Sequence, residues 1–308
     1  MRGERYRRTG LWDTRERSKL LRSDYENGGL FVQLVLLRLS FILILSAIFP
    51  TLLAQEIAEP GSDSPPVYTE KVENEYKFYP GGRIGISVEI PGSLKIIGWD
   101  RGSVQMEAEL KVYSVAEEKA RALLEKSPIR VRYTNSTSTI QISDIPEFKG
   151  HLEVNLTVHV PAAKTDLIAQ IKKGDFTIDG VNGWIETTLD EGNMQLVAID
   201  GYFSGKTGRG NISANMSGNR WSGQGFTAVT QHGRIDLVVP ENYSATLQLD
   251  TRNGEITVDY PAQKIEGEIV PIEVSTQKKA QQLRARLSDG GAPLHIGTQS
   301  GNVSLKKR

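Results

Sequence analysis

Residues 174–214 read GDFTIDGVNGWIETTLDEGNMQLVAIDGYFSGKTGRGNISA, with glycines nine residues apart at 174, 183, 192, 201 and 210. After most of these glycines, polar and apolar residues alternate, as in Gly192-Asn-Met-Gln-Leu196. Side chains alternate across a β-strand, so the second and fourth residues after each glycine face one side and the first and third face the other. The same phrase returns at wider spacing after Gly233, Gly254 and Gly301.

A nine-residue unit is one strand plus one corner, so eighteen residues make a coil with two strands. We therefore predict an all-β fold with a glycine-rich, β-solenoid-like repeat (a single-stranded β-helix) whose stacked coils bury a common core. Glycine supplies the corner conformation that residues with a Cβ resist. The predicted corner glycines are Gly174, Gly183, Gly192, Gly201, Gly210, Gly233, Gly254 and Gly301. An up-and-down antiparallel meander is the alternative, because its hairpins can also recur near nine residues.

The sequence before the repeats is patterned differently. Residues 83–112 alternate between turns at Pro91-Gly92 and Asp100-Arg101-Gly102, which is typical of a meander of strands. One short helix is predicted over 114–126, where Ser114 and Glu117 form a capping box. Further strands are predicted at 129–134, 139–143 and 152–160. We expect one domain over 76–308, with 76–173 as its first half and 174–308 as the glycine-phased half.

The N-terminal region predicts export. Residues 30–53 form an apolar run that ends beside Ala54, so residues 30–54 are either a signal peptide cleaved near Ala54 or an uncleaved membrane anchor. Residues 1–29 hold eight basic and five acidic residues, which indicates a cytoplasmic segment or a mis-assigned extension ahead of the true start. Residues 55–75 are predicted to be a flexible linker. We expect the domain to lie in the periplasm, at the cell surface or outside the cell, or else to be held as a single-pass membrane protein by residues 30–53.

Four short sequence motifs occur along the chain in a characteristic order. They are Leu94-Lys-Ile-Ile-Gly-Trp-Asp100, Val158-His-Val-Pro161, Asp250-Thr-Arg-Asn-Gly-Glu-Ile-Thr-Val258 and Thr298-Gln-Ser-Gly-Asn-Val-Ser-Leu305. With the repeats between them, the chain resembles, over roughly residues 78–308, the bacterial adhesin-like family with β-strand repeats of the DUF4097 type, whose function is unassigned. The resemblance implies an exported protein that binds rather than catalyses, and it supplies no catalytic residues. Residues 262–282 depart from the repeat pattern.

The composition and the absence of known motifs exclude several kinds of catalytic and metal site. The 308 residues include 37 Lys and Arg, 37 Asp and Glu, and no cysteine, which excludes thiol catalysis and cysteine-ligated metals. The balanced charge predicts no nucleic-acid partner. No hydrolase elbow, metalloprotease motif, phosphate-binding loop or EF-hand is present, so we expect no enzyme activity, catalytic residue, cofactor or metal. Acids at the repeat turns are typical of turn chemistry, although paired carboxylates for glycan hydrolysis and calcium at stacked turns are alternatives.

Two ladders follow from the eighteen-residue period. Trp184 and Tyr202 both stand one residue after a repeat glycine, eighteen residues apart, and a further eighteen reaches Arg220, beside Trp221. We predict that these four residues form an outward aromatic strip that binds sugar rings or a partner's apolar surface. Packing against a neighbouring loop is the alternative.

The second ladder consists of Asp175, Asn193 and Asn211, which are also eighteen residues apart. We expect it to stabilise corners through side-chain hydrogen bonds.

These observations predict an exported, non-enzymatic envelope protein, an adhesin-like or scaffold module that binds a glycan or an envelope protein. The alternative is a membrane-anchored periplasmic sensor or assembly partner that touches the membrane only through residues 30–53. A β-helical glycan hydrolase is the third possibility.

Overall fold

The computed structural model describes residues 65–272 and 280–308, which form an all-β structure with one short α-helix, α3 (Glu117–Leu124). The strands of the first half are β1 (Tyr68–Lys77), β2 (Arg83–Val88), β3 (Gly92–Trp99), β4 (Ser103–Val112), β5 (Ile129–Tyr133), β6 (Thr137–Ile142) and β7 (Leu152–Pro161). The strands that follow are β8 (Asp166–Asp179), β9 (Asn182–Glu191), β10 (Met194–Val197), β11 (Asp200–Arg209), β12 (Ile212–Asn215), β13 (Gly225–His232), β14 (Ile235–Val239), β15 (Ala245–Thr251), β16 (Ile256–Asp259), β17 (Ile265–Ile272), β18 (Ala280–Leu287), β19 (Pro293–Ser300) and β20 (Val303–Lys307). Two short 3₁₀ turns lie at Pro146–Phe148 and Ala262–Lys264.

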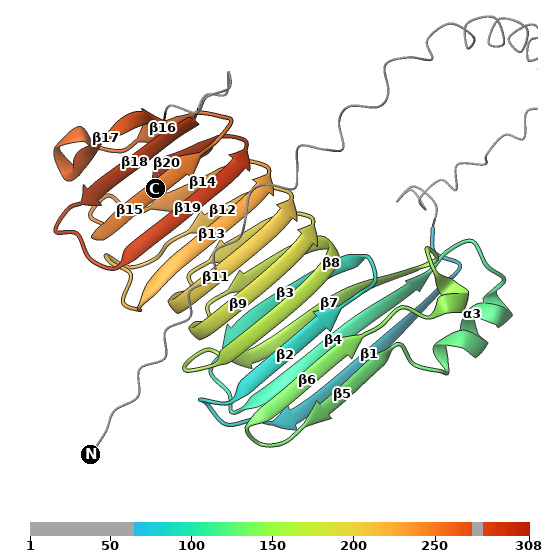
Figure 1. Ribbon diagram of the computed structural model, residues 1–308. Helices are drawn as coiled ribbons and strands as arrows, with labels where there is room; N and C mark the ends of the chain where they lie inside the picture. Colours follow the sequence, from blue (N-terminus) through green and yellow to red (C-terminus); the bar gives the residue numbers. More distant parts are fainter. Residues whose placement is uncertain (1–64, 273–279) are drawn as a thin grey trace, which may run out of the picture. The chain divides into compact units, whose positions relative to one another are not determined.

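The strands pair into two sheets, here called sheet A and sheet B (Figure 1). Sheet A has the order β1, β4, β7, β3, β8, β10, β12, β14, β20, β16. Sheet B has the order β5, β6, β2, β8, β9, β11, β13, β19, β15, β18, β17. Strand β8 serves both sheets, because its first half pairs with β9 and the part after Gly174 pairs with β10.

Successive repeat strands alternate between the two sheets and pair in parallel. Met194 lies opposite Phe176 on one side and Ile212 on the other, a spacing of eighteen residues in each direction. These parallel pairings show that an antiparallel meander is wrong for the repeats. The residues that the pattern places inward are buried, including Phe176, Ile178, Met194, Leu196, Ile212, Ala214, Ile235, Leu237, Val303 and Leu305.

The last repeat in the sequence is not the last in the stack. β19 lies between β13 and β15, and β20 lies between β14 and β16 (Figure 1). The coil that contains Gly301 is therefore inserted between the coils of Gly233 and Gly254. β18 pairs antiparallel with β15 and β17 pairs antiparallel with β18, so the repeat pattern gives way after β16 to an antiparallel addition at the end of sheet B.

The corner glycines form two columns. In the first, a Cβ on each member after Gly92 would lie 1.7–2.0 Å from the carbonyl oxygen of the glycine before it in the column, a distance that no side chain tolerates. This column runs Gly92, Gly174, Gly192, Gly210, Gly233, Gly301, Gly254. The second column contains Gly183 and Gly201 and continues to Gly223, which the nine-residue spacing does not predict.

The second predicted ladder stabilises the corners as expected. Oδ1 of Asp175 accepts from the backbone N–H of Asn193 at 3.0 Å, and Oδ1 of Asn193 accepts from the N–H of Asn211 at 3.0 Å. Oδ1 of Asn211 in turn accepts from the backbone N–H of Arg234, also at 3.0 Å. Each bond satisfies a backbone donor at a corner that would otherwise need water.

The structure corrects two expectations for the first half. β1 begins at Tyr68, inside the predicted linker 55–75; its sequence is highly charged because it is the edge strand of sheet A, where charge discourages further pairing. The predicted meander over 83–112 is wrong, since β2 pairs in sheet B with β6 and β8, whereas β3 pairs in sheet A with β7 and β8.

The predicted extension 1–29 and export segment 30–54 lie outside the described residues. Within 65–272 and 280–308, the structure contains no helix with the length and apolar character needed to span a bilayer.

Candidate functional site

The outward face of sheet B carries the predicted aromatic pair. Trp184 on β9 lies opposite Tyr202 on β11, and their rings stack with centroids 4.0 Å apart and planes 26° apart. Trp184 is 42% exposed, which is unusual for so large an apolar side chain. Its indole N–H donates to Oε1 of Glu186 at 2.7 Å and so fixes the orientation of the ring. The eighteen-residue period therefore placed these two residues together correctly.

Arg220 and Trp221 do not extend this pair. The residue opposite Tyr202 on the next strand is Gly225, which lies 23 residues later (225 − 202) rather than eighteen. Trp221 is buried at the corner, edge-on to Phe226 at 5.4 Å, and its indole N–H donates to the carbonyl oxygen of Gly201 at 3.0 Å. Five additional residues shift the register, so the predicted strip of four is a stacked pair plus a core tryptophan and a separate exposed arginine.

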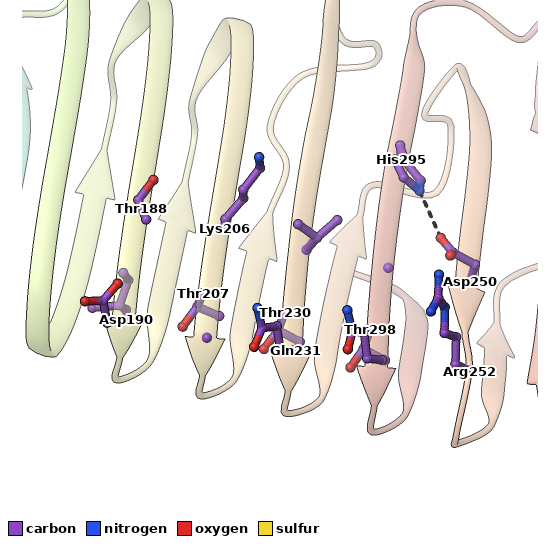
Figure 2. A pocket seen from close by; sticks show the side chains of 15 residues that line it. Thr188, Asp190, Lys206, Thr207, Thr230, Gln231, Asp250, Arg252, His295 and Thr298 are labelled. Atoms are coloured by element: carbon purple, nitrogen blue, oxygen red, sulfur yellow. Dashed lines mark hydrogen bonds and ion pairs between the residues drawn. The ribbon is translucent and has the colours of Figure 1, made fainter. Parts of the chain in front are cut away.

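A hollow of about 440 Å³ opens on sheet B across β9, β11, β13, β19 and β15; we call it the sheet B hollow (Figure 2). Lys206, Val229, Gly297 and Asp250 lie in one row across these strands. Gly297 leaves space at the floor, and a Cβ there would lie 2.7 Å from Oδ2 of Asp250. The hollow therefore exists because small residues interrupt a face of longer polar side chains.

His295 and Asp250 form the central polar contact of the hollow. Nε2 of His295 on β19 lies 2.9 Å from Oδ2 of Asp250 on the neighbouring β15, as Figure 2 shows. The hydrogen bond to the Asp250 carboxylate raises the pKa of His295, and the negative charge of Asp250 adds to this effect, whereas burial opposes it. Protonated imidazole is thus favoured beyond its ordinary range.

Two cations lie around this pair. Lys206 on β11 and Arg252, the residue directly after β15, are exposed and line the hollow, and among the described residues neither side chain has an ion-pair partner. Asp190 on β9 is the other acid of the lining. The hollow thus offers cationic, anionic and hydroxyl groups together, which suits recognition of a polar ligand.

A row of buried threonines supports the floor. Thr230 donates its hydroxyl hydrogen to the carbonyl oxygen of Gly210 at 3.1 Å, and Thr298 does the same to Gly233 at 2.9 Å. Figure 2 shows Thr207, Thr230 and Thr298 at matching positions on neighbouring strands. The strands under the hollow are therefore fixed to the glycine corners of the adjacent coils.

The acids that suggested catalysis or calcium binding serve the fold at several corners. Asp175 accepts from the N–H of Asn193, and Asp200 accepts from the backbone N–H groups of Gly201 and Ser222. In the part of the chain that the structure describes, no group of three or more His, Asp or Glu side chains is placed to hold a metal ion.

Sequence reasoning missed the sheet B hollow because its two halves are distant in the chain. His295 and Asp250 are 45 residues apart and meet only because the last coil is inserted beside β15. The sequence does contain one indication of the strand register: a threonine stands three residues before Gly210, Gly233, Gly254 and Gly301. Aligning the repeats on this threonine gives the register of β15 and β19, although it does not give their order.

No family model matches the sequence, and no curated protein matches it, so the resemblance to the DUF4097 type stays a prediction. Among solved structures, the chain is similar to a candidate cell adhesion protein from Clostridium sporogenes, with 12% identity, coverage of 78% of this chain and 100% of that one, and a TM-score of 0.37. It is also similar to a candidate adhesin from Bacteroides fragilis (14% identity, 78% and 97% coverage, TM-score 0.25). A third similar structure is a candidate lipid-binding protein from Parabacteroides distasonis (8% identity, 77% and 94% coverage, TM-score 0.21). All three TM-scores lie below 0.5, so the proposals below rest on the geometry of this chain.

Proposed function

We propose that this protein is an exported, non-enzymatic module of the bacterial envelope, adhesin-like in role, that binds a glycan on the outward face of sheet B. The observation that carries the proposal is the exposed stack of Trp184 on Tyr202. Large apolar side chains held in water by a fixed geometry mark binding surfaces, and a flat aromatic ring suits the apolar face of a sugar.

The hollow and the aromatic pair lie on the same face of the same strands. Trp184 and Thr188, which lines the hollow, are four positions apart on β9, which is about 13 Å at the rise of an extended strand. One extended oligosaccharide can therefore contact the stacked rings and the polar lining together. Such a long, shallow contact is the type of binding expected of an adhesin-like or scaffold module.

We further propose that residues 166–308 are a β-solenoid with a two-strand coil. The parallel pairings at eighteen residues and the glycine column support this. A stack of this kind supplies a rigid, repeated outer face, because each strand is held on both sides by its neighbours.

The proposed cellular location of the protein depends on residues 30–54. We propose cleavage near Ala54 and release outside the cytoplasm, with residues 30–53 kept as an anchor in the alternative of a membrane-held sensor or assembly partner. Cell fractionation with external protease and intact-mass measurement separates the two: a surface-accessible species starting at Gln55 or Glu56 supports the adhesin-like role. A shielded species that retains residues 30–53 supports the sensor.

Glycan binding is tested by affinity electrophoresis against a panel of neutral and acidic soluble polysaccharides. Trp184→Ser and Tyr202→Ser should each weaken binding about tenfold, because each removes half of the stacking surface. Tyr79→Ser is the matched control, since Tyr79 is 58% exposed and lies outside the hollow and the stacked pair. Unchanged binding in folded Trp184→Ser and Tyr202→Ser proteins overturns the proposal.

A further inference from the structure

We propose that the sheet B hollow binds an anionic group, carboxylate or sulfate, so that the ligand of this face is an acidic polysaccharide. This inference rests on the proposed function and deepens it. The Trp184–Tyr202 pair would contact a sugar ring, while the charged substituent of the same chain lies between Lys206 and Arg252.

The two cations flank the hollow from opposite sides. Lys206 is on β11, Arg252 directly follows the end of β15, and the two intervening strands, β13 and β19, present Val229 and Gly297 in the same row as Lys206. Three strand spacings of about 4.8 Å separate β11 from β15, so the cations lie on opposite sides of the hollow. A volume of about 440 Å³ lies within the range of sites that hold one or two small polar units.

Several cations elsewhere on the surface are neutralised by a neighbouring acid, whereas these two are not. Arg234 and Lys306 both pair with Asp236, and Arg286 pairs with Glu266. Lys206 and Arg252 make no such contact with the residues that the structure describes. A guanidinium presents a planar fork that matches a carboxylate or sulfate in two parallel hydrogen bonds, and an ammonium adds a mobile point charge.

The acidic side chains that line the hollow do not cancel its positive charge when His295 is protonated. Asp250 is engaged by His295 at 2.9 Å, and Asp190 lies on β9, the strand farthest from Arg252. When His295 is protonated, the lining carries three positive charges from Lys206, Arg252 and His295 against two negative charges. An anion is therefore attracted to the side of the hollow near β15 and β19.

Two pairs of polymers with matched backbones test the charge. The full chain is titrated with polygalacturonate and with its methyl ester, and with dextran sulfate and plain dextran, in buffer of fixed salt. We expect each acidic polymer that binds to do so at least tenfold more tightly than its neutral partner. Preference within the polygalacturonate pair alone identifies a carboxylate, and preference within the dextran pair alone identifies a sulfate.

Variants locate the charge effect. Lys206→Gln and Arg252→Gln should each lower affinity for the preferred acidic polymer about tenfold. Arg132→Gln is the matched control, because Arg132 is an exposed cation in the same row of sheet B as Glu186, on the distant β5, and should leave affinity within twofold. An equal loss in all three variants means a nonspecific attraction and overturns the inference.

The outcomes separate this inference from the proposed function. Equal binding of the acidic and neutral members, still lost in Trp184→Ser, overturns the anionic site and retains the glycan-binding face. Loss in Lys206→Gln and Arg252→Gln without loss in Trp184→Ser retains the anionic site and overturns the role of the aromatic pair. No binding of any of the four polymers overturns both.

Discussion

The hydroxyl of Thr298 donates to the carbonyl oxygen of Gly233 at 2.9 Å, across 65 residues of sequence. Thr298 is buried on β19, and Gly233 is the corner that precedes β14. The bond therefore ties the inserted last coil to the coil that ends at residue 239. The equivalent bond from Thr251 to the carbonyl oxygen of Gly301, at 2.8 Å, ties the inserted coil to its other neighbour.

Replacing Thr298 by Val should destabilise the fold by about 1–2 kcal/mol, because a part-buried hydrogen bond is lost while the shape of the buried side chain is kept. Chemical denaturation at neutral pH measures this. Thr246→Val is the control: its hydroxyl donates to the carbonyl oxygen of Gly291 at 3.0 Å, but the residue is exposed and water can replace it, so the change should be below about 0.5 kcal/mol. Equal losses in the two variants would contradict the role given to the Thr298 bond.

Gly192→Ala should cost at least about 3 kcal/mol or prevent folding, because the new Cβ would lie 2.0 Å from the carbonyl oxygen of Gly174 and because φ is +139°. Gly85→Ala is the matched control in a strand. Its Cβ would meet nothing closer than the carbonyl oxygen of Ser138 at 3.9 Å, so thermal unfolding should change little. A stable Gly192→Ala protein would mean that the coils can separate at their corners.

The His295–Asp250 pair makes stability depend on pH above the ordinary imidazole value. The pKa of His295 is raised in the folded protein, so its contribution is fully present below the unfolded value of about 6.5 and is lost as the pH rises through the folded pKa. The charged groups that line the hollow with His295 are Lys206 on β11, Asp190 on β9, Asp250 on β15 and Arg252 directly after β15. We expect the free energy of unfolding to decrease from pH 6 to pH 8 in the wild type and to change less in His295→Gln, as measured by urea titration. A profile that His295→Gln leaves unaltered would assign the pH dependence to other groups.

Asp236 gives the opposite dependence at acid pH. Burial acts to raise its pKa, but hydrogen bonds from Ser304 and Lys306, with the charges of Lys306 and Arg234, outweigh this and lower it. Its contribution is therefore present above the unfolded value of about 3.8 and is lost as the pH falls through the folded pKa. Asp236→Asn should reduce stability at pH 6, with the difference from wild type closing as the pH falls through the folded pKa of Asp236. Asp259→Asn, at an exposed acid on β16, is the control and should leave stability at pH 6 within about 0.5 kcal/mol of wild type.

Local repetition made much of this fold predictable. The alternation after each glycine identified the buried positions, and the eighteen-residue period gave the register from Trp184 to Tyr202 and from Asp175 to Asn211. Both depend on short-range geometry, which every strand repeats. The period was wrong at Arg220, because a corner with five extra residues changes the register without breaking the pattern of the strands on either side.

The long-range arrangement could not be read in the same way. β1 is a charged edge strand, so its apolar face is too sparse to distinguish it from a linker. The pairing of His295 with Asp250 depends on which coil lies beside which, and all the coils present nearly the same apolar face to their neighbours. The sheet B hollow followed from that order rather than from any local motif.

The insertion of β19 and β20 has a consequence for biosynthesis. During translation, β15 and β16 emerge before the strands that will separate them from β13 and β14. The last third of the molecule therefore cannot grow by adding each new coil to the end of those already folded. It must hold a gap, or reopen one, until residues 293–307 have emerged, so β19 and β20 determine when this part of the protein becomes protease-resistant.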